Sequence, residues 1–433
     1  MRTAVFFGAI AVAAVVAACS KDTTELPTGP HISASCPGLD VGARPAAISL
    51  PVHAPAVMPV LGAGFDSLRY TAEVAAFTNV AAHGTIVYTT TWGFRGPNAG
   101  NRINVWDASG NALVLVDTIT VDGATTLGDV AVSDDGSLLA VATERTGGSI
   151  VIFDLTDPRH PKQISRFSNA DTDPGVHTAE IGRVNGVLYG FLSIDPINST
   201  PARLVIVDLS NPTAPQEIFT KVTGNPYVHD TFVRDGLLFV ALWDDGLDIW
   251  DIGGCGTGAS PSHPVVLGNV KTFGGEVHNV WWYHDPNGGK RFAFVGQEGA
   301  GTIGSSSKGD IHVVDISDPS QPKEVAFYHI DGAGTHNFSV DEVRGILYAA
   351  YYNGGVRAID IRGDLATCTQ SQQFTTANPL LTRCDLKLMG REMGLGLLDQ
   401  GRPVYVWGVQ LLGGRVFASD MLNGVWSIGA LAR

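Results

Sequence analysis

The chain has 433 residues, of which 42 are acidic and 28 are Lys or Arg, and its formal net charge at pH 7 is −14. This acidic balance argues against a nucleic-acid partner, because phosphate binding requires a basic surface. The 52 Gly, the 23 Pro and a hydrophobic fraction of 44% indicate many tight turns between short buried strands, and they disfavour a fold of long helices.

The N-terminus has the pattern of an export signal. Residues 1–18 contain one Arg followed by an unbroken apolar run, which has signal-peptide length and is too short for a membrane span. The tetrapeptide VAAC that ends at Cys19 resembles the bacterial lipobox, where the signal is cleaved before a Cys that then carries lipid. An ordinary secretory signal with a coincidental Cys is the alternative.

We therefore expect an exported protein that is anchored to a membrane through lipid on Cys19. Residues 19–64 are polar and contain Pro, which suits an extended tether. The location would be periplasmic or at the cell surface, and Ser20 after the lipidated Cys favours the outer membrane.

The four remaining cysteines suit an oxidising compartment. We favour a disulfide between Cys368 and Cys384, which bracket one loop-like insert, and a second between Cys36 and Cys255, which would attach the tether to the folded part. Four cysteines allow three connectivities, and the sequence leaves all three open. A metal cluster is disfavoured because no two cysteines have C-x-x-C spacing.

Residues 65–433 contain a repeated motif. The stretch LVIVDLSNPTAP at residues 204–215 returns as IVIFDLTDPRHP from Ile150, as IHVVDISDPSQP from Ile311 and, with an insert, from Leu247. A period of about 50 residues with several short strands per unit predicts a β-propeller. The aspartates that end the third strand of each unit are Asp107, Asp154, Asp208, Asp251, Asp315 and Asp360.

The motif itself has a structural explanation. Asp208 can accept a hydrogen bond from the backbone two residues further on, in an Asx-turn that stops the strand. Pro212 then keeps Asn211 out of the helical region, and Pro215 keeps the linker extended. These residues therefore shape a turn and carry no chemistry.

The number of blades depends on how the chain ends. The last unit supplies only three strands, and we expect residues 66–74 to add the outermost fourth strand and so close the ring. This count predicts an all-β fold with seven blades. Six blades is the alternative, if residues 361–403 are an insertion.

The repeated motif resembles that of the LVIVD-repeat proteins, which are bacterial and archaeal surface proteins built as propellers. The resemblance covers roughly residues 66–430, and its best copy is literal at Leu204–Asp208. It implies the propeller fold and a surface location, and it implies no established reaction.

Four units begin their innermost strand with a histidine, and this pattern does not follow from the need to fold. In a propeller the first strand of each blade lines the axis, so these residues would face the central channel near one mouth. The histidines are His177, His229, His278 and His336, and the equivalent places in blades one, two and seven would hold Asn79, Asp129 and Trp407.

Loops between the second and third strands should open on the same face as the histidines. They would bring acidic and aromatic residues to the rim, namely Trp92, Asp195, Trp243, Asp244, Asp245, Glu298 and Asp420.

Imidazoles grouped with carboxylates suit a divalent transition metal, with Glu180, Asp230 or Glu276 as further ligands or as partners that orient the rings. Such an ion could polarise a carbonyl or activate water. The competing interpretation is structural, since a histidine repeated in duplicated units can also tie neighbouring blades together by hydrogen bonds.

These observations favour a lipid-anchored binding or scaffold module that contacts a protein or small-molecule ligand at the mouth lined by the four histidines. The alternative is a metal-dependent hydrolase or oxidase, although no G-x-S-x-G, H-E-x-x-H or P-loop motif is present and we favour a non-enzymatic role. We expect a monomer, and no cofactor other than this divalent transition metal is indicated.

Overall fold

The computed structural model describes Cys36 and residues 46–79, 84–198, 200–377, 379–398 and 402–431. The expected signal peptide, Cys19 and most of the expected tether lie outside these residues. Within the described part, no helix has the length and hydrophobicity needed to cross a lipid bilayer.

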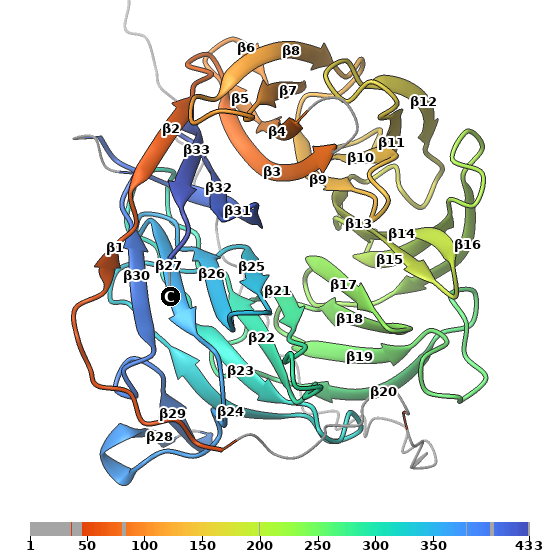
Figure 1. The fold of residues 1–433 in the computed structure, drawn as a ribbon. Coiled ribbons are helices and arrows are strands. Elements are labelled where there is room, and N and C mark those ends of the chain that lie inside the picture. The colour runs from red at the N-terminus through yellow and green to blue at the C-terminus, as the bar shows by residue number, and fades with distance from the viewer. Residues whose placement is uncertain are drawn as a thin grey trace, which may run out of the picture. The chain divides into compact units, whose positions relative to one another are not determined.

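Seven four-stranded antiparallel sheets form the blades of a β-propeller, as the repeat predicted (Figure 1). The first strand of each blade contacts the first strand of the next, and β31 of blade seven returns to β3 of blade one, so these strands surround one axis. Blades one to three contain β3 (Tyr70–Asn79), β4 (Gly84–Trp92), β7 (Arg102–Asp107) and β8 (Val114–Thr120); β9 (Leu127–Val132), β10 (Leu138–Thr143), β11 (Ser149–Asp154) and β12 (Lys162–Phe167); and β13 (Val176–Val184), β14 (Val187–Ile194), β15 (Arg203–Asp208) and β16 (Gln216–Val222).

Blades four to seven continue the same order from the axis outwards. They contain β17 (Asp230–Arg234), β18 (Leu237–Ala241), β19 (Leu247–Asp251) and β20 (Val265–Val270); β21 (Val277–Trp282), β22 (Phe292–Gln297), β23 (Ile311–Asp315) and β24 (Lys323–Tyr328); β25 (Phe338–Asp341), β26 (Ile346–Ala350), β27 (Val356–Asp360) and β30 (Glu392–Gly396); and β31 (Val406–Leu412), β32 (Arg415–Asp420), β33 (Gly424–Gly429) and β2 (Val60–Gly64). A small hairpin, β5 (Phe94–Arg95) with β6 (Asn98–Ala99), projects from blade one.

The ring is closed by β2, which pairs with β33 as the outermost strand of blade seven. The expectation that residues 66–74 would supply this strand was wrong, because β3 begins at Tyr70 and is the innermost strand of blade one. The reason is burial: residues 71–76 are buried, as befits a strand at the axis, whereas β2 alternates between exposed and partly buried positions. The propeller therefore begins before residue 65, its expected start.

Blade six is irregular because the chain leaves it and returns. After β27 the chain forms a 3₁₀ turn (Gln370–Gln372) and a hairpin of β28 (Gln373–Ala377) and β29 (Leu380–Asp385). Strand β29 of this hairpin pairs in parallel with β24 of blade five. The chain then comes back as β30, to which the short β1 (Ala56–Val57) adds in parallel. Residues 361–403 thus hold both an insertion and the fourth strand of blade six.

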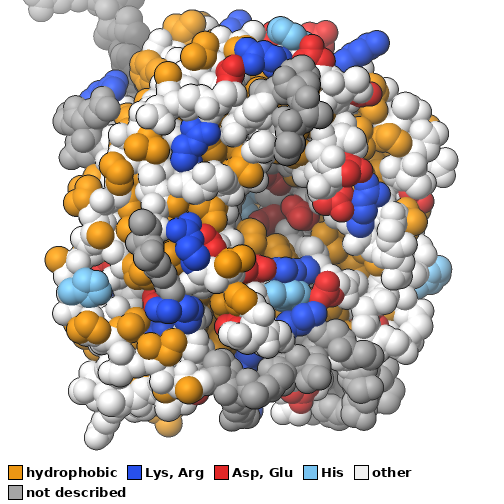
Figure 2. Space-filling view, viewed as in Figure 1, with side chains coloured by type: hydrophobic (Ala, Val, Ile, Leu, Met, Phe, Trp, Pro, Cys, Tyr) orange, Lys and Arg blue, Asp and Glu red, His pale blue; other side chains and the backbone are white. Residues whose placement is uncertain are grey.

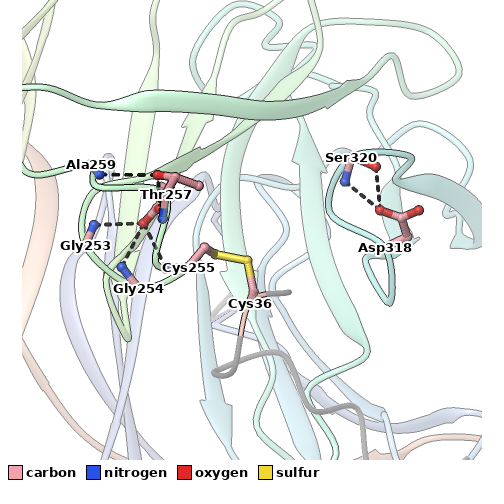
Figure 3. The surroundings of a disulfide bond; sticks show 9 residues. Cys36, Gly253, Gly254, Cys255, Thr257, Ala259, Asp318 and Ser320 are labelled. Carbon is pink, nitrogen blue, oxygen red and sulfur yellow. Dashed lines mark hydrogen bonds between the residues drawn. A yellow bond between two sulfur atoms is a disulfide. The ribbon is translucent and has the colours of Figure 1, made fainter. Parts of the chain in front are cut away.

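Both favoured disulfides are present, Cys368 to Cys384 in the insertion and Cys36 to Cys255. Figure 3 shows the second of these beside the turn that follows β19. The Asp251 carboxylate accepts hydrogen bonds from the backbone N–H groups of Gly253, Gly254 and Cys255, so one ionised side chain shapes the loop that presents the cysteine.

The Asx-turn predicted at Asp208 is confirmed, since its carboxylate accepts a hydrogen bond from Ser210 N–H at 2.7 Å. The same bond recurs at the end of the third strand in blades one, two, four, five and six. The donors to Asp107, Asp154, Asp251, Asp315 and Asp360 are the backbone N–H groups of Ser109, Thr156, Gly253, Ser317 and Arg362. The repeated aspartate therefore terminates each strand by one local mechanism.

Candidate functional site

The innermost strands carry a repeated β-bulge at the histidine positions. The pairing register shifts between Val176 and Thr178 in blade three and between Val277 and Asn279 in blade five, so His177 and His278 are the extra residues. Blade seven has the same shift around Trp407. A bulge redirects the extra side chain, which explains why several blades turn this position to the axis.

The structure brings the four histidines together in one arc. The Nε2 atoms of His177 and His229 are 3.0 Å apart, and those of His278 and His336 are 3.1 Å apart. The rings of His229 and His278 join the two pairs, with centroids 4.0 Å apart. Trp407 continues the arc, since its ring lies 4.5 Å from that of His336.

Glu298 lies inside this arc and is its central carboxylate. Its Oε2 atom is 3.3 Å from His229 Nε2 and 3.7 Å from His278 Nε2, and the ligand atoms of these three side chains lie within 4.8 Å of one another. The other oxygen, Oε1, accepts a hydrogen bond from the Tyr352 hydroxyl.

Two further carboxylates, those of Asp195 and Glu144, face His177. Its Nδ1 atom lies 3.6 Å from Asp195 Oδ1 and 3.8 Å from Glu144 Oε2, and Glu144 also accepts a hydrogen bond from the Trp92 indole at 3.1 Å. Glu144 was not anticipated from the sequence. Its position was a usable signal, because it directly follows the second strand of its blade, as Glu298 does.

Electrostatics divides the four imidazoles into one cation and three neutral rings. Burial opposes protonation of His177, but Asp195 and Glu144 outweigh it and raise its pKa to about 10. Burial lowers the pKa of His229, and the charge on His177 lowers it further. Burial and neighbouring imidazoles hold the pKa of His278 and of His336 well below the usual value.

Glu298 is ionised in this setting. Burial alone would raise its pKa, but the imidazole of His278 and the hydrogen bond with His229 lower it to about 2. The histidine end of the channel, by which we mean the four histidines and Glu298, therefore combines neutral imidazole nitrogens with a carboxylate. This donor set binds divalent transition metals.

A cavity of about 490 Å³ opens onto the histidine end. His177, His229 and Glu298 line this cavity. His278 and His336 lie deeper, where the channel holds a smaller cavity of about 30 Å³. Of the residues expected at the rim, Trp92, Asp195, Trp243 and Glu298 line the cavity, which also has Glu144, Arg145, Thr146, Pro174, Pro196, Ile197 and Tyr227 in its wall.

Three expected rim residues do not line the cavity. Asp244 is exposed, Asp245 faces Lys271 at 3.7 Å, and Asp420 is fully buried. Asp420 accepts hydrogen bonds from the backbone of Tyr405 and Leu422, so it shapes a turn.

Three of the turns on this face hold a non-glycine residue in the left-handed region. Arg145, Trp243 and Tyr352 have φ of 75°, 56° and 38°. A non-glycine residue in this conformation costs roughly 1–2 kcal/mol. All three project into the site, where Arg145 and Trp243 line the cavity and Tyr352 holds Glu298. Strained backbone thus coincides with the residues that form the site.

The remaining predicted residues fall elsewhere. Asn79 ends β3, whereas the blade-one residue beside the histidines is Glu73, whose Oε1 lies 3.5 Å from His336 Nδ1. Asp129 lines the narrow channel as expected. Glu276, expected to assist the histidines, instead faces Lys308 at 3.5 Å and Gln297 at 3.4 Å.

Glu180 and Asp230 lie further along the channel, beyond the histidines. With Glu73 and Asp129 they surround a cavity of about 150 Å³ that we call the carboxyl end. The face drawn in Figure 2 is hollowed at its centre, with acidic side chains in the hollow. Burial raises the pKa of Glu73, Glu180 and Asp230 well above the usual values, and neighbouring carboxyl groups add to the effect.

Fold and site together define a seven-bladed β-propeller with a histidine-rich axial channel. Its particular repeat is the LVIVD repeat, whose family model matches residues 200–223, 227–272 and 306–329. These ranges correspond to β15 and β16 of blade three, to all strands of blade four, and to β23 and β24 of blade five. The resemblance seen in the motif is thereby confirmed. No curated protein matches the chain.

Proposed function

We propose that the protein is an exported, lipid-anchored β-propeller that acts as a binding module of the cell envelope, with its ligand site at the histidine end. The sequence up to Cys19 supports export and lipidation, and the two disulfides suit an oxidising compartment. A lipid on Cys19 and the tether would hold the propeller at the membrane.

The observation that carries this proposal is the 490 Å³ cavity. Small-molecule sites measure roughly 300–1,000 Å³ and combine apolar walls with a few convergent polar groups. Here Trp92, Tyr227 and Trp243 supply aromatic surface, while His177 and Glu298 converge at the floor.

The charges of the cavity indicate a polar ligand without a large net charge. Arg145 and His177, whose pKa is about 10, offset two of the three carboxyl groups in the cavity lining, which belong to Glu144, Asp195 and Glu298. Aromatic surface beside such groups suits a compact ligand with one apolar face.

A fragment screen tests this site. The full chain, purified in detergent without a His tag, would be screened by ligand-observed NMR against a library of neutral and zwitterionic fragments. We expect a set of mutually competing hits that the double variant Trp92→Ala, Trp243→Ala no longer binds. Hits that the double variant retains, or no competing set at all, would contradict a ligand site in this cavity.

Anchoring is tested separately by Cys19→Ser. We expect the wild type to incorporate labelled palmitate and to sediment with membranes, and the variant to do neither. Equal membrane association of the two would refute the lipid anchor.

A metal-dependent hydrolase or oxidase is the second candidate. It is favoured by one observation, the approach of His229, His278 and Glu298 beside an open cavity. Metal-dependent turnover of chromogenic phosphoesters or carboxyl esters by the wild type, and its loss in Glu298→Gln, would support the hydrolase.

A further inference from the structure

The distances from Glu298 to His229 and to His278 are close to those between neighbouring ligand atoms of one metal ion. Zinc bonds to imidazole nitrogen and carboxylate oxygen measure about 2.0–2.2 Å, so neighbouring ligand atoms in a tetrahedral site lie roughly 3.4 Å apart. Glu298 Oε2 is 3.3 Å from His229 Nε2 and 3.7 Å from His278 Nε2. Only small side-chain shifts would bring all three atoms within bonding distance of one ion.

Hydrogen bonds to neighbouring blades explain only part of the arrangement of these imidazoles. Nδ1 of His229 and Nδ1 of His278 have no hydrogen-bond partner among the described residues, although the two side chains are only 8% and 2% exposed. Their Nε2 atoms both approach Glu298, at 3.3 Å and 3.7 Å. The same atoms lie 3.0 Å from His177 Nε2 and 3.1 Å from His336 Nε2, so an ion that binds them must displace these two contacts.

The contacts around the three ligands hold them in this arrangement. Tyr352 donates to Oε1 of Glu298 and leaves Oε2 directed at the imidazoles. Trp243 stacks on the ring of His229, with centroids 5.3 Å apart and planes inclined by 23°. Hydrogen bonds to ligating carboxylates and fixed imidazole planes are typical of metal sites.

The geometry points to a divalent transition-metal site formed by His229, His278 and Glu298, with a further coordination position directed into the 490 Å³ cavity. This inference rests on the proposed function and deepens it, because the ion would bind a nitrogen or oxygen donor of the cavity ligand. Two imidazoles and one carboxylate suit zinc, and also copper or ferrous iron.

The position of the cavity explains why three protein ligands suffice. His229 and Glu298 line the wide cavity, while His278 approaches from the narrow part of the channel. Sites with three protein ligands and an open position are those that bind water or substrate at the metal, whereas structural zinc sites are closed by four protein ligands.

His177 and His336 flank the ion and are assigned a supporting role. His177 Nδ1 already faces Glu144 and Asp195, and His336 Nδ1 faces Glu73. Each lies beside one ligand imidazole through its Nε2 atom. The four histidines of the repeat are thus divided into two ligands and two neighbours.

Metal binding is tested on the full chain, purified in detergent without a His tag and stripped with a chelator. Zn²⁺, Co²⁺ and Cu²⁺ would be titrated individually, with calorimetry and elemental analysis as readouts. We expect one ion per chain, with Co²⁺ giving the intense visible absorption of a tetrahedral complex. A wild type that retains no stoichiometric ion of any of the three would overturn the inference.

Matched variants locate the ion. Glu298→Gln and His278→Gln should lose stoichiometric binding, whereas Glu276→Gln and His263→Gln, which change the same residue types away from the cluster, should keep it. Tyr352→Phe should bind roughly 10–100-fold more weakly, because it removes only the contact that orients Glu298. Binding that survives unchanged in both Glu298→Gln and His278→Gln would place any ion elsewhere.

The outcomes separate this inference from the proposed function. Thermal unfolding of each variant identifies one that fails to fold, and Tyr352→Phe provides a reading that does not depend on loss of a ligand. Fragments that bind the cavity of a protein unable to bind metal would leave the binding module standing without the ion. Stoichiometric metal in a protein that binds no fragments would support the metal site and contradict the ligand site in the cavity.

Discussion

The two ends of the axial channel are built from the same innermost strands, yet their buried carboxyl groups differ in charge. At the histidine end, Glu298 faces imidazoles and accepts a hydrogen bond from Tyr352, and its pKa falls to about 2. At the carboxyl end, Glu180 has no Lys, Arg or His among the described residues that line its cavity, and its pKa rises well above normal. The pKa of Asp230 is also raised well above normal, although this residue lines the narrow channel together with the histidines.

The difference shows that burial alone does not determine the state of an acidic side chain. Desolvation disfavours the ionised form at both ends, and only a basic or hydrogen-donating partner reverses its effect. His229 and Asp230 are adjacent in sequence and both line the narrow channel, but only His229 reaches the wide cavity and only Asp230 reaches the carboxyl end. One end therefore offers an ionised carboxylate beside imidazoles, whereas burial at the other end favours the protonated form of Glu180 and Asp230.

Glu298→Gln is expected to have the largest effect on stability. In metal-free protein at pH 7 the free energy of unfolding should fall by roughly 2–3 kcal/mol, because an ionised acceptor in a buried network is lost. Since the folded pKa of about 2 lies below the usual 4.5, this contribution is present above about pH 4.5 and disappears as the pH falls towards 2. Urea unfolding at several pH values measures it, and a pH-independent loss would contradict the assignment.

Glu180→Gln should show the opposite pH dependence. The folded pKa of Glu180 is raised, so its contribution to stability is fully present below about pH 4.5 and is lost as the pH rises through the folded pKa. Within that window, each pH unit costs the wild type up to about 1.4 kcal/mol. The variant, which cannot ionise, should therefore gain stability relative to the wild type between pH 5 and pH 8. If the free energies of unfolding of wild type and variant changed equally with pH over this range, Glu180 would not be neutral in the folded protein.

Asp195→Asn should change a pKa more than it changes stability. Because Asp195 is the largest of the charges that raise the pKa of His177, its removal should lower that pKa from about 10 towards 6.5. NMR titration of histidine-labelled protein measures this shift. An unchanged titration of His177 would mean that Glu144 alone sustains its charge.

Glu276→Gln is expected to have the smallest effect. The carboxylate faces the exposed Lys308 and not the imidazoles, so the free energy of unfolding should change by less than about 0.5 kcal/mol. Urea unfolding alongside Glu298→Gln makes the comparison direct. A decrease in the free energy of unfolding as large as that of Glu298→Gln would mean that Glu276 does interact with the histidines.

Much of the fold was predictable because the same local turn chemistry occurs in six of the seven blades. Each strand-ending aspartate binds a backbone N–H group two residues further on, as at Asp208 and Ser210, and this signal needs no tertiary information. The closing strand was not predictable in this way. Residues 60–64 and 66–74 both have strand-like patterns, and only their burial against β33 or at the axis distinguishes them.

The sequence predicted which strand positions carry the histidines of the candidate site, but it did not predict which side chains contact them. Equivalent positions in duplicated blades place the four histidines together, as their spacing indicated. Which carboxylates face them depends on side-chain direction after a bulge, and Glu276, only two residues before His278, points to Lys308 instead. Glu73 of blade one lies beside His336 of blade six although blade seven stands between these blades in the ring, and their distance in the sequence does not indicate this contact.

The propeller, its aspartate turns and the histidine register could be predicted from the sequence, because they follow from patterns within each unit. It also allowed the two disulfides to be paired as the structure has them. The folded chain adds what the sequence does not contain: Glu298 joins His229 and His278, two histidines lie at the cavity and two lie deeper, and burial raises the pKa of Glu180. The distances between the axial side chains and the burial of their carboxyl groups arise only when seven blades close around one axis, so a single repeat does not contain them.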